Sequence, residues 1–98
     1  MEHIYEVCLA HELSKRGVSV QRQVIVPIVY DGLRFDEGLR LDLLAEDMVI
    51  CEIKSVETMH PLFMAQTLSQ LKLTGKRLAF PINFNVPTIK DGIKRIVL

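Results

Sequence analysis

The apolar positions near the start of the chain recur every three or four residues. Helical spacing connects Tyr5, Cys8, Leu9 and Leu13. This pattern predicts a helix over residues 2–16. A second helix is indicated further along, because Pro suits the first turn of a helix and Gly suits the position after its end.

That second helix is predicted from Pro61 to about Thr74, with Gly75 placed to end it. Between and after the helices, the apolar residues form short runs rich in Val, Ile and Leu, which is typical of strands. The strand-forming segments are residues 18–30, Leu39–Ala45, Met48–Ser55 and Arg77–Phe84. The short tail that follows is either a last strand, which we favour, or a helical turn.

The first strand contains Pro27, which predicts a bend or break there because proline lacks a backbone donor. The second and third strands are close enough in sequence to form a hairpin. The order of elements is therefore αβββαβ. It predicts an α/β (α+β) fold with a mixed central sheet flanked by helices.

Composition narrows the class of protein. The 98 residues suffice for one domain, predicted to span residues 1–98, and 49% hydrophobic residues exclude a disordered chain. The apolar runs are too short to cross a bilayer, so no membrane association is expected. Cys8 and Cys51 form no CxxC pair, which favours a reducing, cytoplasmic location. The formal net charge is zero, so binding to nucleic acid would need a local patch, a partner or a metal.

Charged residues interrupt two of the apolar strands. In the segment VICEIKSVE, Glu52 and Lys54 lie two residues apart and therefore point to one face of the strand. In the segment GLRLDLLAED, Asp42 stands among leucines. If the carboxylates of Asp42 and Glu52 converge, they require a cation between them, and Mg²⁺ prefers such oxygen ligands. A nearby lysine can stabilise charge on a phosphate, so these residues indicate phosphodiester hydrolysis.

The register of the hairpin decides whether this site exists. A two-residue turn at Glu46-Asp47 would pair Asp42 with Cys51 and turn Glu52 to the other face of the sheet. The site therefore predicts a three-residue loop or a bulge. The sequence also leaves open an alternative, in which Glu52 and Lys54 form a simple ion pair on a partly exposed strand.

Longer stretches of the chain resemble a known family. The segments EHIYE, GLRLDLLAEDMVICEIKSVE, AQTLSQLKLTG and INFNVPTIKDGIKRIV are similar to the GxxExxY proteins, a small prokaryotic family of the PD-(D/E)XK nuclease superfamily. The similarity covers nearly the whole chain. It implies a restriction-endonuclease-like fold, in agreement with the order of elements, and a metal-dependent nuclease acting on DNA or RNA.

The resemblance also implies a role for each matching residue. Asp42 and Glu52 would bind Mg²⁺ or Mn²⁺ with the backbone carbonyl of Ile53, and an acid of the first helix, Glu6 or Glu2, would complete the site.

The catalytic residues implied by the family are Lys54 and Gln66, together with the two carboxylates of the strands. The chain departs from the family at Gln70, where tyrosine is common, and at Pro81, where the strand usually has an aliphatic residue. Such a proline indicates a bulge or an edge position.

A third departure is that the family's leading glycine and preceding helix have no counterpart here. Their lack is expected to expose apolar residues of the first helix and the tail, which favours a homodimer. These residues are Ile4, Val7, Ile93 and Ile96. The alternative to an enzyme is a catalytically inactive module that keeps the nuclease fold for binding or oligomerisation.

Overall fold

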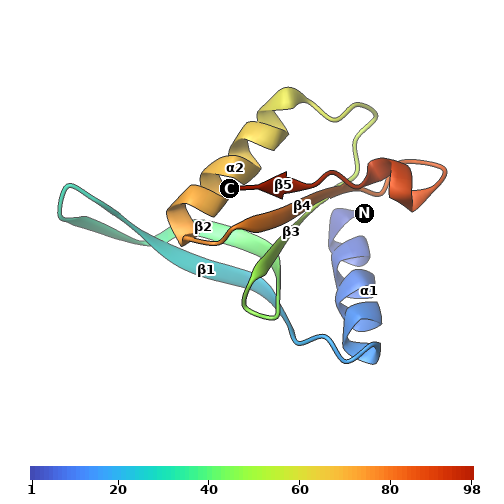
Figure 1. Cartoon of the computed structure of the whole chain (residues 1–98), viewed down its shortest axis with the longest axis horizontal. Coiled ribbons are helices and arrows are strands. Elements are labelled where there is room, and N and C mark those ends of the chain that lie inside the picture. The colour runs from blue at the N-terminus through green and yellow to red at the C-terminus, as the bar shows by residue number, and fades with distance from the viewer.

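The computed structural model describes residues 1–98 as one mixed sheet with a helix against each face (Figure 1). In chain order the elements are α1 (Glu2–Lys15), β1 (Val20–Tyr30), β2 (Leu33–Ala45), β3 (Val49–Lys54), α2 (Pro61–Thr74), β4 (Leu78–Asn83), the 3₁₀ helix η1 (Ile89–Gly92) and β5 (Ile96–Val97).

The five strands follow chain order across the sheet, β1-β2-β3-β4-β5. All neighbouring strands are antiparallel except β3 and β4, which are parallel because α2 makes the crossover between them. The predicted fold class is confirmed. The tail combines a 3₁₀ turn with the short strand β5, so both of the structures that the sequence left open for it are present.

Two apolar clusters fill the space between the sheet and its helices. The cluster under α1 consists of Ala10, Leu43, Cys51, Ile53 and Ile82. The cluster under α2 consists of Leu41, Leu44, Ile50, Leu71 and Ala79. Alternate residues of β3 therefore point into opposite clusters, so both faces of this strand are buried. A charged side chain on β3 is consequently held in a largely apolar layer.

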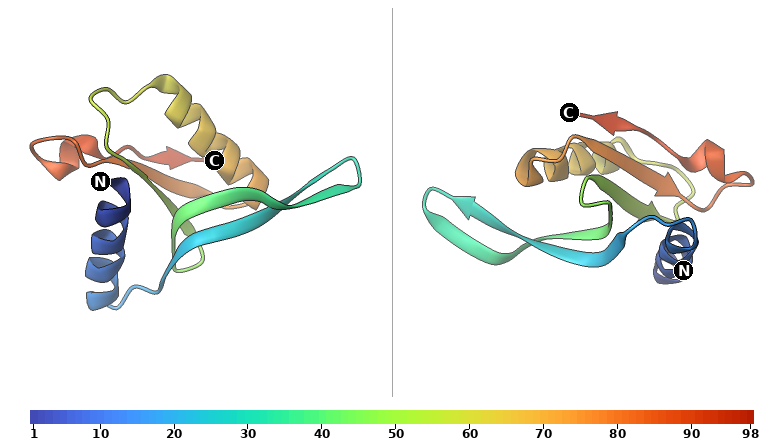
Figure 2. Two further views of the ribbon diagram at one scale, coloured as in Figure 1. Left: turned by 180° about the vertical axis from the view of Figure 1, so that it is seen from behind. Right: turned by 60° about the horizontal axis from the view of Figure 1, so that its bottom comes forward.

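The β1–β2 hairpin is longer than the sequence pattern indicated. We expected the second strand to begin at Leu39, but β2 begins at Leu33, directly after the turn at Asp31-Gly32. Polar and apolar residues are mixed in this stretch because it projects from the body of the protein, as Figure 2 shows, and has no buried face to enforce a pattern. The predicted irregularity at Pro27 is confirmed by a shift of register beside it.

Helix α2 has the predicted limits. The imidazole of His60 accepts a hydrogen bond from the backbone N–H of Leu62 at 3.0 Å, which caps the start of the helix. Gly75 ends it in the left-handed conformation with φ of 73°. Neither helix is long and apolar enough to cross a membrane.

Pro81 lies inside the sheet, between β3 and β5. Its carbonyl accepts a hydrogen bond from the backbone N–H of Lys94, just before β5 begins. The proline nitrogen therefore faces a stretch of the tail that is not paired as a strand, which makes the missing donor tolerable. The sequence indicated a bulge or an edge position, and this prediction was wrong, because β4 is an interior strand and its register with β3 is unbroken.

Candidate functional site

The turn between β2 and β3 contains three residues. Ala45 pairs with Val49 across the hairpin, and Leu43 pairs with Cys51. The same register places Asp42 opposite the next residue of β3, Glu52. The prediction of an odd-numbered loop is thus confirmed, and the two carboxylates meet across neighbouring strands.

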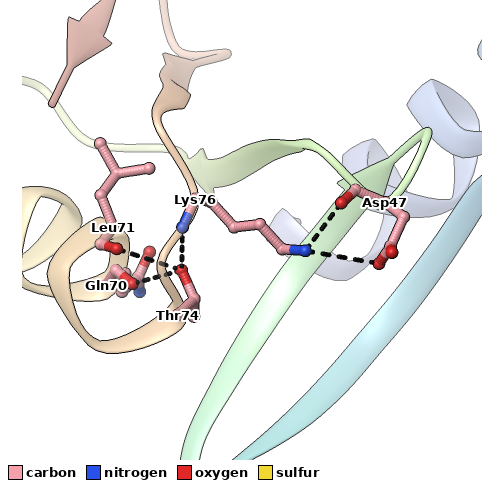
Figure 3. Close-up of polar contacts among 5 residues, drawn as sticks. All are labelled: Asp47, Gln70, Leu71, Thr74 and Lys76. Carbon is pink, nitrogen blue, oxygen red and sulfur yellow. Dashed lines mark hydrogen bonds and ion pairs between the residues drawn. The ribbon is translucent and has the colours of Figure 1, made fainter.

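The conformation of this turn depends on two residues in the left-handed conformation and on Lys76, which follows the C-terminal end of α2. Glu46 and Asp47 have φ of 53° and 54°. The ammonium of Lys76 donates to the carbonyl of Asp47 at 2.7 Å and lies 3.6 Å from its carboxylate, as Figure 3 shows. The clamp joins the end of α2 to the turn. It thereby supports the register on which the site depends.

The pairing of β2 with β3 ends before Asp42 and Glu52. Beyond that point, hydrogen bonds to side-chain carboxylates connect the two strands. The backbone N–H of Ile53 donates to Oδ2 of Asp42 at 2.9 Å, and the backbone N–H of Asp42 donates to Oε1 of Glu52 at 3.4 Å. Each carboxylate therefore reaches across to the opposite strand. This exchange fixes both groups at the point where β2 and β3 separate.

Glu52 is buried, with only 7% of its surface exposed. Burial raises the pKa of its carboxyl to about 8, and the negative charge of Asp42 adds to the rise, while hydrogen bonds from the Asp42 backbone and the Gln70 side chain oppose it. The same environment raises the pKa of the Cys51 thiol to about 11, mainly by burial and then through the charge of Glu52. At neutral pH and without a cation, Glu52 therefore retains its proton.

The metal-free protein should lose stability as the pH rises from about 5 to about 8. The folded state holds a proton on Glu52 in this range that the unfolded chain releases, so the free energy of unfolding falls by up to about 1.4 kcal/mol per pH unit. Urea unfolding in the presence of a chelator measures the slope. Glu52→Gln has no proton to lose there and serves as the control. Equal slopes for the two proteins would contradict the buried, protonated carboxyl.

Lys54 follows on the same face of β3 but does not join the carboxylates. Its ammonium lies over the ring of Phe63 on α2, 4.4 Å from the ring centre, and forms no ion pair. The simple ion pair between Glu52 and Lys54, which the sequence left open, is therefore not formed. A half-buried cation held by an aromatic face is poised beside the site without neutralising it.

The acids of α1 are engaged in other contacts. Glu6 is buried and accepts from the guanidinium of Arg22 at 2.8 and 3.0 Å and from the Gln23 amide at 2.6 Å. Glu2 accepts from the backbone N–H of Ser55 at 2.9 Å, one residue after Lys54. Both oxygens of Glu6 thus have partners, whereas Glu2 lies at the end of the strand that carries the site.

Helix α2 contributes two glutamines. The predicted Gln66 is exposed and lines a hollow of about 310 Å³ together with Leu39, Ser69, Gln70 and Leu73. Gln70, rather than Gln66, is close enough to Glu52 to lower the pKa of its carboxyl. The sequence had marked Gln70 only as a departure from the family. Its contact with β3 depends on how α2 crosses the sheet, which no local pattern contains.

The donor set fits a divalent cation in part. Two carboxylates that meet across adjacent strands, one of them buried, offer the oxygen ligands that Mg²⁺ or Mn²⁺ prefers. No group of three or more His, Cys, Asp or Glu side chains gathers at one point, so no third side chain of these types joins the two carboxylates in this arrangement.

A mixed sheet between two helices, with an aspartate and a Glu-x-Lys segment meeting on adjacent strands, defines a nuclease-like class of domain. The model of the PD-(D/E)XK nuclease superfamily matches residues 1–96, and the chain belongs to this superfamily. No curated protein and no solved structure shows significant similarity to this chain.

Proposed function

We propose that the protein is a metal-dependent nuclease that hydrolyses phosphodiester bonds of DNA or RNA. The observation that carries this proposal is the meeting of Asp42 with the buried Glu52 on adjacent strands, followed on the same strand by Lys54. In this proposal the two carboxylates and the backbone carbonyl of Ile53 hold Mg²⁺ or Mn²⁺. When bound, the ion supplies positive charge that polarises water and the phosphate.

Each remaining residue of the site has a separate role in this proposal. Glu52 must release its proton for the ion to bind, so the site is expected to load better at alkaline pH. Lys54 leaves the ring of Phe63 and stabilises the negative charge that develops on the phosphate. Gln66 borders the hollow beside the site and is suited to position the substrate. Glu2 and Glu6 remain proposed ligands, but each would first have to give up its present hydrogen bonds.

The test is a titration of the metal-free protein with Mg²⁺ and with Mn²⁺ by calorimetry, at pH 6 and at pH 8.5. We expect saturable binding that is tighter at the higher pH because the proton on Glu52 competes with the ion. Cleavage of mixed single- and double-stranded DNA and RNA is measured in the same buffers, with a chelator as the control. Absence of saturable binding at both pH values would refute the proposal.

The second candidate function is a binding module without catalysis, as the sequence also allowed. It is favoured by the position of Lys54, which rests on Phe63 rather than beside the carboxylates, and by the zero net charge. Homodimerisation suits this candidate, since Ile4, Val7 and Ile93 are exposed, whereas Ile96 is half-buried in β5. Cleavage by the wild type would exclude it.

Membership of the GxxExxY proteins and a cytoplasmic location also stay proposals, supported by the similar segments and by the two free cysteines.

A further inference from the structure

The proposed metal site lacks a protein ligand on one side. The two carboxylates of β2 and β3 approach from the sheet, and the nearest acid of α1 with a buried position, Glu6, is taken by an arginine and an amide. Magnesium takes six oxygen ligands, so two carboxylates leave positions for water, substrate and further protein oxygens. The remaining side of the pair Asp42–Glu52 faces α2.

Gln70 of α2 lies on this side. Its side chain is close enough to Glu52 to lower the pKa of that carboxyl, while its Oε1 atom is shielded from solvent and has no hydrogen-bond partner. It is the only buried side-chain nitrogen or oxygen of the chain without a partner. A buried carbonyl oxygen left unpaired has lost its hydrogen bonds to water without replacement, so its retention calls for an explanation.

The backbone of Gln70 is held firmly. Its carbonyl accepts from the hydroxyl of Thr74 at 2.7 Å, and this hydroxyl also accepts from the backbone N–H of Lys76 at 3.3 Å, as Figure 3 shows. Lys76 in turn clamps the β2–β3 turn. One connected set of contacts therefore positions Gln70 and the hairpin that carries the carboxylates.

We propose that Oε1 of Gln70 is a direct ligand of the divalent cation and completes, from α2, the donor set begun by Asp42 and Glu52. This inference rests on the proposed function. A glutamine amide can turn about its last bond and offer either its N–H groups or its oxygen to the site. The N–H groups suit a carboxylate acceptor, and the oxygen suits the cation.

The competing role is that of a positioning residue that only donates to Glu52. The two roles differ in their response to added charge. If Gln70 ligates the ion, Gln70→Glu keeps an oxygen, adds a negative charge and should bind Mn²⁺ as tightly as the wild type or more tightly. If Gln70 only donates, Gln70→Glu places a third carboxylate against Glu52 without a donor and should weaken binding.

The experiment is Mn²⁺ calorimetry at pH 8.5 on the wild type, Gln70→Met and Gln70→Glu, with circular dichroism to verify folding. We expect Gln70→Met, which keeps the length but loses the oxygen, to bind about tenfold or more weakly. Ser69→Glu is the matched control, because it adds the same charge in the same hollow one residue away and leaves Gln70 intact. It should not reproduce the effect of Gln70→Glu.

A second readout observes the atom itself. The side-chain carbonyl carbon of Gln70 should shift in NMR spectra on saturation with Mg²⁺, and that of Gln66 should not. Wild-type binding with unchanged affinity in Gln70→Met, or weakened binding in folded Gln70→Glu, would overturn the ligand role while leaving the proposed function intact. Absence of ion binding by the wild type would instead refute the proposed function, and the ligand role with it.

Discussion

Replacing Lys54 by alanine is expected to lower the rate of cleavage by about 10²–10³-fold while leaving the affinity for Mg²⁺ almost unchanged. The ammonium forms no ion pair with Asp42 or Glu52 in the metal-free protein, so its removal withdraws no partner from the carboxylates. A protonated lysine has no free electron pair with which to bind a cation. Its contribution is therefore confined to the step in which charge builds on the phosphate.

Two variants separate charge from packing in this prediction. Lys54→Met retains most of the side-chain stem and should be as inactive as the alanine variant. Phe63→Leu removes the ring that holds the ammonium but keeps the lysine, and should lower activity far less. The measurements are cleavage rates at saturating Mg²⁺ and calorimetry on each variant. If Lys54→Ala cleaves as fast as the wild type, the lysine has been assigned to the wrong role.

The condition under which the two carboxylates converge could be deduced from the sequence, because the side chains of a strand alternate strictly. With that parity, Asp42 and Glu52 share a site only if the hairpin loop has an odd number of residues, and the loop has three. Local sequence also sufficed for α2, since Pro61 and Gly75 mark its ends by backbone chemistry that tertiary contacts seldom override.

Other parts of the site depend on contacts between distant segments and could not be predicted. The family resemblance offered Glu6 or Glu2 as the ligand from α1, but it held no sign that Gln23, a left-handed residue of β1 with φ of 54°, donates its amide to Glu6. Likewise, Phe63 and Gln70 reach β3 only because α2 crosses the sheet at one particular angle. Helical spacing shows which residues share a face of α2, but not which strand that face meets.

Asp42→Asn should have two effects of opposite sign. Together they would identify Asp42 as a metal ligand whose charge destabilises the folded protein when no metal is bound. The first effect is loss of function. The variant lacks a charged ligand, and its affinity for Mg²⁺ should fall by more than the roughly 10–100-fold that loss of a supporting contact costs. Cleavage should be lost with it. The backbone N–H of Ile53 keeps its acceptor, because the asparagine oxygen can replace Oδ2 of the aspartate.

The second effect is a gain in stability without metal. The charge of Asp42 helps to raise the pKa of Glu52 to about 8, after the larger contribution of burial. Removing that charge lowers this pKa towards its unfolded value, so less stability is lost as the pH rises towards 8. Urea unfolding in a chelator at pH 8 should therefore show Asp42→Asn to be more stable than the wild type, and excess Mg²⁺ should reverse the order because only the wild type binds it. General damage to the hairpin would make the variant less stable under both conditions, and that result would contradict the proposed metal site.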